Sequence, residues 1–266
     1  MSQPLRPCVL VFAGHDPSGG AGIQADIESI AAQGAHALTV ITALTVQDND
    51  RVYAVHAVAT PIILQQARAL VAKIPVAAIK IGIVAHAENA LAIAGFIQEL
   101  QSMQPDLAVV LDPVLGSGRG DALALDDAVA ALQPLLKVAT LITPNLPEAR
   151  RLCPDLPEGA QQAQHLLQHR CQDVLIKGGH ASDAQVRNSW FSRQGQLDWQ
   201  WPRLPGEFHG SGCTLAASVA AQLAMGRNMR DSLQIAQDFT QSSLQQAFAI
   251  ADGQLIPQRQ RNYPFE

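Results

Sequence analysis

Hydrophobic positions along the chain form short continuous runs, and each run is followed by a longer segment with apolar residues at helical spacing. Short runs rich in Val, Ile and Leu are typical of buried strands, whereas the longer segments predict helices. The predicted strands are residues 8–14, 37–46, 77–84, 107–114, 139–145 and 173–179, and the predicted helices between them are about 21–34, 61–73, 88–103, 126–136 and 159–169.

This alternation predicts the fold class. Repeated βαβ units whose strands are apolar on both faces are typical of an α/β protein with a mostly parallel central sheet covered by helices on both sides. Residues 188–204 change the pattern to two aromatic runs, which predict a β-hairpin near a sheet edge, and two helices are expected at 211–225 and 229–251. We expect one domain over residues 1–266, with a disordered or loosely docked tail after Pro257.

Composition narrows the class of partner. Charged residues make up 15% of the chain, hydrophobic residues 48%, and the net charge is -5. Such a chain has no basic field to attract nucleic acid or an anionic membrane surface, so a small molecule is the expected partner. The four cysteines show no C-x-x-C pairing, and no apolar stretch approaches the roughly 20 residues of a membrane span. We therefore expect reduced thiols and a cytoplasmic protein.

A glycine-rich segment, GHDPSGGAGIQAD (residues 14–26), follows the first predicted strand and opens the first predicted helix. Gly20-x-Gly22 formally matches part of the dinucleotide-binding fingerprint. In that fingerprint the glycines follow the strand almost at once, whereas here a broad loop separates them from it. Two other interpretations remain open. The segment is either a glycine-rich turn capped by Ser18, or a loop that closes over a small polar substrate with Asp26 facing it.

Gln47 and Asp112 stand where two further predicted strands end. The Gln47 amide can donate and accept hydrogen bonds at once, which suits the edge of an aminopyrimidine, although surface turn chemistry is the simpler explanation. Asp112 is the first charged residue after a buried strand, and it suits a metal or phosphate site or starts an ordinary Asp-Pro turn. The loop that follows, LGSGRGD, carries Arg119 as its one cation.

The segments TPNLPEA and LIKGGH follow the last two parallel strands predicted in the chain. Asn145 and Glu148 match a capping box at the start of a helix, while Glu148 also suits a Mg²⁺ ion held through water beside nucleotide phosphates. Lys177 emerges from a strand into a Gly-Gly turn, where it either meets phosphate oxygens or is simply exposed.

The segment HGSGCTLAAS (residues 209–218) carries the most specific local signal. The backbone N–H groups of Gly210 to Cys213 would lead a helix N-terminus, which is a physical site for a phosphoryl group in transit. It is not a Walker A loop, because no Gly-Lys-Ser/Thr follows the glycines. Packing of a small residue at the helix start remains the alternative explanation for Cys213 alone.

Seven segments together resemble, in order and spacing, the hydroxymethylpyrimidine/phosphomethylpyrimidine kinases of thiamin biosynthesis: AGHDPSGGAGIQAD, VITALTVQ, KIGIV, LDPV, LITPNLPEA, IKGGH and HGSGCTLAA. The resemblance extends roughly from Val9 to Ala251. It implies a ribokinase-like, three-layer α/β/α fold and a homodimer. It also implies transfer of the γ-phosphoryl group of ATP to the hydroxymethyl group of 4-amino-5-hydroxymethyl-2-methylpyrimidine, and then to the resulting monophosphate.

The resemblance also implies roles for individual residues. Around the pyrimidine it places Gly14, Asp26, Gln47, Ile83 and Val114. Around ATP and its Mg²⁺ it places Asp112, Asn145, Glu148 and Lys177, with Glu148 serving the metal. The anion hole is implied to consist of the amides of Gly210, Ser211, Gly212 and Cys213. Cys213 stands where sugar kinases of this fold usually carry an aspartate base, and the helix N-terminus is expected to lower its thiol pKa from about 8.5.

One segment departs from the family pattern. Typical members have AKSGD after the DPV segment, whereas this chain has GSGRGD, and Arg119 is expected to take over the contact with the transferred phosphate. The departure keeps a pyridoxal or pyridoxine kinase of the same fold as an alternative. Two alternatives from other classes are a dinucleotide-binding oxidoreductase built on Gly20-x-Gly22 and a non-catalytic ligand-binding regulator.

Overall fold

The computed structural model describes residues 5–117, 119–121, 123, 125, 127–156, 159–168, 170–180 and 184–260. The strands in this part of the chain are β1 (Cys8–His15), β2 (His36–Gln47), β3 (Val52–Ala57), β4 (Ala78–Ile81), β5 (Ala108–Leu111), β6 (Leu141–Ile142), β7 (Asp173–Ile176), β8 (Gln185–Ser192) and β9 (Gly195–Pro202). They form a single sheet in the order β3-β2-β1-β4-β5-β6-β7-β8-β9. The strands from β2 to β7 in this order are parallel, and antiparallel strands stand at both edges.

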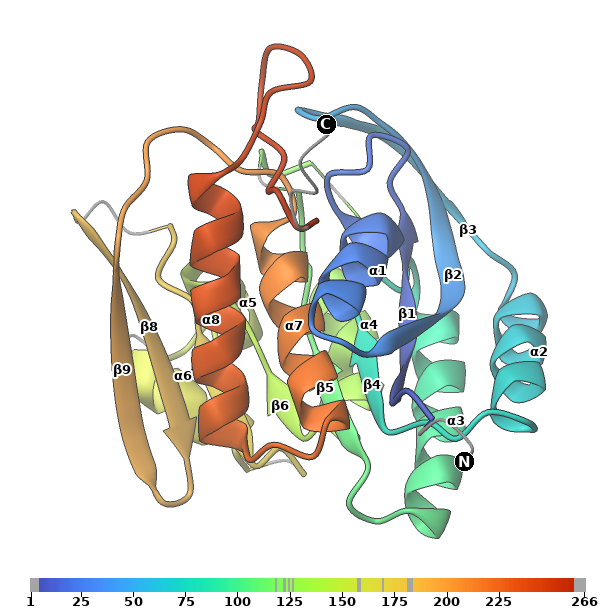
Figure 1. Ribbon diagram of the computed structural model, residues 1–266. Helices are drawn as coiled ribbons and strands as arrows, with labels where there is room; N and C mark the ends of the chain where they lie inside the picture. The colour runs from blue at the N-terminus through green and yellow to red at the C-terminus, as the bar shows by residue number, and fades with distance from the viewer. Residues whose placement is uncertain are drawn as a thin grey trace.

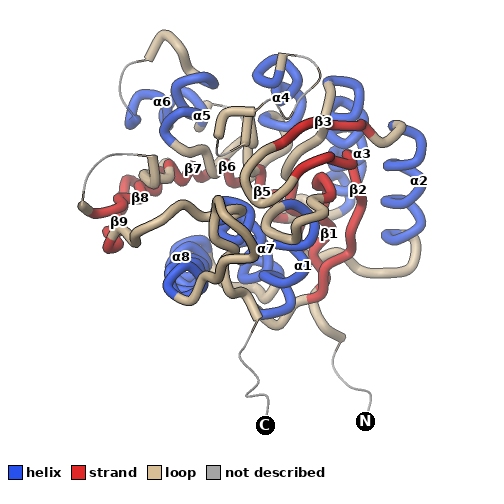
Figure 2. Tube along the Cα trace, turned by 90° about the horizontal axis from the view of Figure 1, so that it is seen from above, coloured by secondary structure: helices blue, strands red, loops and turns tan. Residues whose placement is uncertain are grey.

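Helices cover both faces of the sheet, as seen from above in Figure 2. One face carries α1 (Gly22–Ala32), α7 (Ser211–Ala224) and α8 (Met229–Gln245). The other face carries α2 (Thr60–Val71), α3 (Ala87–Met103), α4 (Ala128–Leu136), α5 (Leu146–Leu152) and α6 (Gly159–Leu166). The predicted three-layer α/β/α architecture with a mostly parallel sheet and an edge hairpin is therefore confirmed.

Strand β1 shows why both faces need cover. Leu10 and Phe12 point into the core beneath α3, where the Phe12 ring meets the edge of Phe96 at a centroid distance of 6.1 Å. Val9 and Val11 belong to the core on the other face, which includes the buried alanines of α7. Alternate side chains of one strand thus enter two different cores, so the strand has no polar face.

Helix α7 presents alanine to the sheet. Ala216, Ala217, Ala220 and Ala221 are fully buried, and side chains this small let the helix backbone pack closely on β4, β5 and α1. In Figure 1, α7 lies between α1 and α8, in front of the central strands. This packing brings the first turn of α7 to the carboxyl ends of the parallel strands.

The sequence prediction missed one strand and gave no bounds for one short helix. Strand β3 pairs antiparallel with β2 and forms one edge of the sheet. Helix α5 is too short for its hydrophobic period to be read, although the capping residues at its start were recognised. Helix α8 ends at Gln245 rather than at residue 251, because the chain then turns and Phe248 pairs with Ile256.

The C-terminal segment is docked further than expected. Leu255 N–H donates to Glu207 O at 2.8 Å, and His209 N–H donates to Leu255 O at 2.9 Å. Beyond Pro257, the Arg259 side chain is only 1% exposed. The expectation of a loose tail is therefore wrong for residues 258–260, while residues 261–266 lie outside the described part of the chain.

In the described ranges, no helix combines the length and the apolar character that crossing a membrane requires.

Candidate active site

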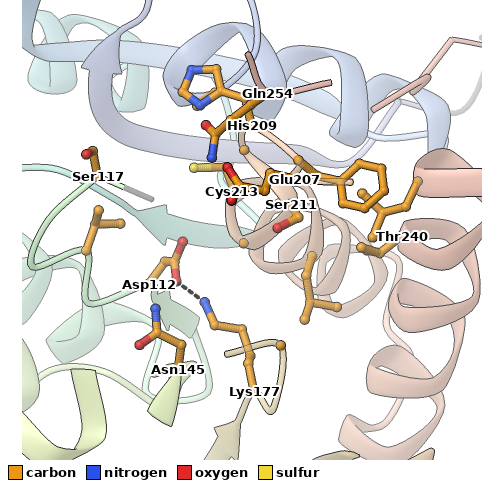
Figure 3. A pocket seen from close by; sticks show the side chains of 18 of the residues that line it. Asp112, Ser117, Asn145, Lys177, Glu207, His209, Ser211, Cys213, Thr240 and Gln254 are labelled. Atoms are coloured by element: carbon orange, nitrogen blue, oxygen red, sulfur yellow. Dashed lines mark hydrogen bonds and ion pairs between the residues drawn. The ribbon is translucent and has the colours of Figure 1, made fainter. Parts of the chain in front are cut away.

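A cavity of about 530 Å³ lies where the carboxyl ends of β1, β2, β5 and β7 meet the first turn of α7 (Figure 3). It brings together the predicted site residues with two exceptions, Asp26 and Arg119. Its lining includes Gly14, Gln47, Ile83 and Val114, which were predicted to surround a pyrimidine, and Asp112, Asn145, Glu148 and Lys177, which were predicted to serve a nucleotide. The lining also includes Gly210, Ser211, Gly212 and Cys213.

The turn before α7 requires glycine at position 210. Gly210 has φ 79°, in the left-handed region, and a Cβ atom there would lie 2.1 Å from Gly20 O. A side chain is therefore excluded on conformational and on steric grounds. Helix α7 starts at the next residue, Ser211, so the first N–H groups of the helix have no partner within the helix, and such groups can bind an anion.

Gly212 faces the Lys177 ammonium and the Asp112 carboxylate. A Cβ atom at this position would lie 3.1 Å from Lys177 Nζ and 3.6 Å from Asp112 Oδ2. The absence of a side chain lets the helix N-terminus approach the lysine ammonium directly. A group bound by the helix amides would thus also be within reach of Lys177.

The Cys213 thiol is in a more unfavourable environment for ionisation than the sequence suggested. Burial raises the pKa of this thiol, Lys80 lowers it, and the carboxylates of Asp26 and Asp112 raise it again. The balance is a raised pKa, so the expected lowering by the helix N-terminus is wrong. The neutral thiol is accordingly the dominant form at neutral pH.

Lys177 and Asp112 form an ion pair inside the cavity, with Nζ 2.8 Å from Oδ1 (Figure 3). The hydroxyl of Thr143 donates to the same oxygen at 3.2 Å. Burial would lower the pKa of Lys177, but Asp112 and Glu148 outweigh it, so the pKa is raised. The ammonium therefore keeps its charge and remains available to a phosphate.

The capping box predicted at α5 is confirmed. Asn145 Oδ1 accepts from Glu148 N–H at 2.8 Å, and Glu148 Oε2 accepts from Asn145 N–H at 2.7 Å. Glu148 is 7% exposed and lines the cavity. Burial raises the pKa of Glu148 to about 7, with Lys177 opposing the shift and Asp112 adding to it. The residue is thus both a helix cap and a titratable group of the cavity.

Gln47 is the last residue of β2, and this strand pairs with Gly14 and His15 at the end of β1. Thr45, two positions earlier, donates from its hydroxyl to His15 O at 2.8 Å and ties the ends of the two strands together. The Gln47 amide has no hydrogen-bond partner among the described residues. Its donor and acceptor remain available to a ligand in the cavity.

Asp26 does not line the cavity, contrary to the prediction. Its Oδ2 lies 2.8 Å from Lys80 Nζ, and both side chains are fully buried. Lys80 belongs to β4, whose four residues are all buried, so its ammonium needs a buried counter-charge. Asp26 supplies that charge from α1, and its other oxygen, Oδ1, has no hydrogen-bond partner.

Arg119 is also absent from the cavity lining. Its Nη2 lies 2.8 Å from Asp50 Oδ1 and 3.0 Å from Glu207 Oε2, so two carboxylates engage the guanidinium beside the cavity. Glu207 itself lines the cavity. Gly118, the preceding residue of the GSGRGD segment, lies outside the described residues.

Asp16 and His209 line the cavity and were not predicted as site residues. His209 Nε2 lies 2.8 Å from Asp16 Oδ2, while Asp16 Oδ1 accepts from Ser18 N–H at 2.8 Å. Burial raises the pKa of Asp16, but His209 and Ser18 outweigh it and the pKa is lowered. The pair joins the loop before α1 to the turn before α7. The sequence offered no signal for it, because the partners are 193 positions apart.

An apolar part of the cavity lining was also missed. It includes Val186, Trp201 and Leu244, from the edge hairpin and α8. The Trp201 indole is oriented by a hydrogen bond from Nε1 to Gln237 Oε1 of 3.2 Å, and Asn188 Nδ2 donates to the same oxygen at 2.9 Å. These side chains give the cavity lining an apolar part.

Comparison with known proteins decides the family. The model of the family described as phosphomethylpyrimidine kinase matches residues 16–257. A hydroxymethylpyrimidine/phosphomethylpyrimidine kinase of Escherichia coli K12 is 38% identical over 252 residues, covering 92% of this chain and 93% of that protein. The chain belongs to the phosphomethylpyrimidine kinase family. It is therefore a phosphotransferase.

Solved structures of this kinase fold agree with the assignment. A phosphomethylpyrimidine kinase from Clostridium difficile 630 matches with a TM-score of 0.74 and 30% identity, over 90% of this chain and 100% of that chain. A pyridoxal kinase from Bacillus subtilis, solved as an ADP complex, matches with a TM-score of 0.85 and 26% identity, over 96% and 98%. The architecture of this kinase is thus shared with enzymes named for two different acceptors.

Membership of the kinase family removes the oxidoreductase alternative, and the glycines of the first loop have another explanation. Gly22 has φ +58°, and a Cβ atom there would lie 2.3 Å from Gly14 O. At Gly20 a Cβ atom would lie 2.1 Å from His209 Cδ2. These glycines let the loop of the kinase pack against β1 and against the turn before α7.

Proposed function

We propose that this kinase transfers the γ-phosphoryl group of ATP to the hydroxymethyl group of 4-amino-5-hydroxymethyl-2-methylpyrimidine and then phosphorylates the monophosphate, in thiamin biosynthesis. The observation that carries the proposal is the juxtaposition in one cavity of the α7 amides, the Lys177–Asp112 pair and the Gln47 amide. The first two suit a phosphoryl group in transit, and the third suits the edge of a heterocycle.

The nucleotide is proposed to bind against the α7 amides, Lys177 and Trp201, which all line the cavity. Lys177 and the amides of Gly210 to Cys213 would contact phosphate oxygens, and Asn145 would contribute its amide beside them. The apolar surface around Trp201 suits a purine base. Loose phosphoryl transfer needs mainly positioning and charge neutralisation, which these groups provide without covalent chemistry.

The residues of the cavity fit a Mg²⁺ ion held chiefly by ATP. Among the described residues there is no group of three His, Cys, Asp or Glu side chains arranged to hold a metal. Mg²⁺ usually keeps several waters and takes only one or two carboxylates beside the phosphates, which Glu148 and Asp112 would supply here. When bound, the ion would neutralise charge on the phosphates.

The acceptor hydroxymethyl group is proposed to face Cys213, with the ring between Gln47 and the apolar side chains of Ile83 and Val114. Because its pKa is raised, the Cys213 thiol is suited to orient the hydroxyl by hydrogen bonding rather than to serve as a preformed thiolate. The hydroxyl oxygen forms the new bond to phosphorus, the bond to the ADP oxygen breaks, and the hydroxyl proton is released to water.

The second phosphorylation brings another anion into the cavity. Arg119 is proposed to meet it, although its guanidinium now pairs with Asp50 and Glu207. Both partners are partly exposed, and pairs of this kind are worth only about 0–1 kcal/mol. A phosphate at the rim could therefore exchange with these carboxylates at little cost.

The kinase is further proposed to act as a single domain, as a homodimer and in the cytoplasm. Exposed apolar side chains of β2 and β3, among them Leu44, Val46 and Tyr53, support an interface between copies. Four free cysteines are consistent with a reducing compartment.

A pyridoxal kinase is the second candidate, favoured by the TM-score of 0.85 to the Bacillus subtilis enzyme. A coupled assay of ADP formation with the hydroxymethylpyrimidine, pyridoxal and pyridoxine in parallel separates the two. We expect the highest kcat/KM with the pyrimidine, and we expect Gln47→Leu to raise the KM for the pyrimidine without lowering kcat. Turnover of pyridoxal or pyridoxine with none of the pyrimidine would contradict the proposal.

A further inference from the structure

The chain beyond α8 returns to the region between α1 and α7 (Figure 1). The Arg259 side chain is buried there and contacts two segments next to the predicted anion hole. The first is the loop before α1, which contains Gly19 and Gly20. The second is the turn before α7, from His209 to Thr214. Both are distant in sequence from Arg259, and neither contains a residue of opposite charge that bonds to it.

The guanidinium bonds to both segments at once. Its Nε donates to Thr214 Oγ1 at 2.8 Å, and its Nη2 donates to Gly20 O and, at 3.5 Å, to His209 O. Its Nη1 donates to Gly19 O at 3.5 Å and lies 3.3 Å from Glu28 Oε2. The planar fork of donors can satisfy several fixed acceptors in this way, which a single ammonium group cannot.

The hydrogen bonds of Arg259 are linked to the predicted anion hole through further contacts. Thr214 Oγ1, which accepts from Arg259, itself donates to Gly210 O at 2.9 Å. Gly20 O, which also accepts from Arg259, is the atom that a Cβ at Gly210 would meet at 2.1 Å. Arg259 thus acts on the residue that begins the anion hole from two sides, through Thr214 and through Gly20.

We propose that Arg259 is a positioning residue for phosphoryl transfer. Its guanidinium fixes the loop before α1 and the turn before α7 relative to each other, and so holds the Gly210–Cys213 amides in place. The backbone N–H of Gly22, the first residue of α1, contacts the Cys213 sulfur. The same clamp therefore holds the start of α1 against the thiol. This inference rests on the proposed function for its kinetic part, but the closure of the thiol can be measured without turnover.

The test compares Arg259→Gln and Arg259→Lys with the matched control Gln260→Ala. Gln260 is exposed and donates to Glu28 Oε1 at 3.0 Å, so its removal leaves the bonds of Arg259 to both segments intact. Activity is measured well below the Tm of each variant and is normalised to its folded fraction. Alkylation of Cys213 by iodoacetamide is followed separately by peptide mass spectrometry, which distinguishes it from the other cysteines.

We expect Arg259→Gln to lower kcat by roughly 10²-fold, because a displacement of about 1 Å at a transfer site has an effect of this size. The KM for the pyrimidine should change little, since Gln47 lies on β2, and Cys213 should be alkylated several-fold faster. Arg259→Lys should fall between the wild type and Arg259→Gln, and Gln260→Ala should match the wild type.

The proposal requires both the fall in kcat and the faster alkylation of Cys213 in Arg259→Gln. Equal alkylation rates in Arg259→Gln and Gln260→Ala overturn the proposal, as does an unchanged kcat in an active enzyme or a loss that follows only the folded fraction. If the wild type does not phosphorylate the pyrimidine, the proposed function fails, and the alkylation comparison alone then decides whether Arg259 closes the site.

Discussion

Lys177 Nζ lies 2.8 Å from Asp112 Oδ1, and both side chains face Gly212 in the first turn of α7. Because Gly212 has no side chain, the helix N-terminus can approach the lysine ammonium. The arrangement places a fixed cation beside a set of backbone donors. The ammonium stays charged in a largely buried position, because Asp112 and Glu148 together outweigh the effect of burial on the pKa of Lys177. The ion pair therefore holds a charged lysine where the proposed reaction needs a contact to phosphate oxygens.

Replacing Lys177 by Met should lower kcat/KM for ATP by about 10²–10³-fold, the range seen when one fixed donor to a developing charge is lost. It should also destabilise the fold, because Asp112 is left buried without its cation. Steady-state kinetics and thermal unfolding measure the two effects. Lys177→Arg, which keeps the charge, is the control for stability. Wild-type kcat/KM in Lys177→Met would contradict a role for this lysine in phosphate binding.

Cys213→Ser and Cys213→Ala test whether the thiol orients the acceptor or acts as an essential base. If it orients the hydroxyl, Ser should retain most of the activity and Ala should lose about 10-fold, since a single hydrogen bond contributes about 0.5–1.5 kcal/mol. The measurement is kcat with saturating pyrimidine and ATP. A loss of three or more orders of magnitude in both variants would show that the thiolate is required.

The raised pKa of Glu148 should make the stability of the kinase depend on pH. Its pKa is raised to about 7 in the folded kinase from an ordinary value of 4.5, so the folded state binds more protons than the unfolded state between these two pH values. The free energy of unfolding should therefore fall as pH rises from about 4.5 to 7, by an amount on the order of 1–3 kcal/mol.

Glu148→Gln should remove this slope from pH-dependent denaturant titrations without ligand, while the Gln oxygen still accepts from Asn145 N–H and preserves the helix cap. The variant should also need more Mg²⁺ for half-maximal activity. An identical pH slope in the variant and the wild type would assign the titration to another group.

The buried Lys80–Asp26 pair should respond to a double-mutant cycle. Lys80→Met alone should destabilise the fold by about 3–5 kcal/mol, because it strands the Asp26 carboxylate without a partner. Combining it with Asp26→Leu should recover much of this loss, since an apolar pair can replace a buried ion pair. Additive losses in the free energy of unfolding would mean that the two side chains contribute independently.

The fold and much of the site could be predicted because the carboxyl ends of parallel strands meet at one edge of the sheet. Gln47, Asp112 and Lys177 were recognised as polar residues that end apolar strands, and the structure brings them into one cavity. Their proposed roles still depend on the experiments above. Asp26 was misplaced because its position in the first helix does not reveal which way its side chain points. A lysine in the apolar run around Lys80 was the available signal, since such a residue needs a buried carboxylate.

Other features depend on contacts between distant residues. The pairing of Asp16 with His209 joins segments 193 positions apart, and the sequence around neither residue indicates it. The raised pKa of Cys213 likewise reflects burial and two carboxylates that only the folded chain brings near, whereas the helix N-terminus was visible in the sequence. Strand β3 could have been recognised, because Val52–Ala57 follows a turn that is rich in Asp and Asn.

The mass of the product formed from 4-amino-5-hydroxymethyl-2-methylpyrimidine, ATP and Mg²⁺ tests the central claim most directly. The purified chain should add first one and then two phosphoryl groups to the pyrimidine, with one ADP released for each. Accumulation of the monophosphate alone would contradict the second step and the proposed part of Arg119 in it. An unchanged pyrimidine mass under conditions where pyridoxal is phosphorylated would contradict the proposed function itself.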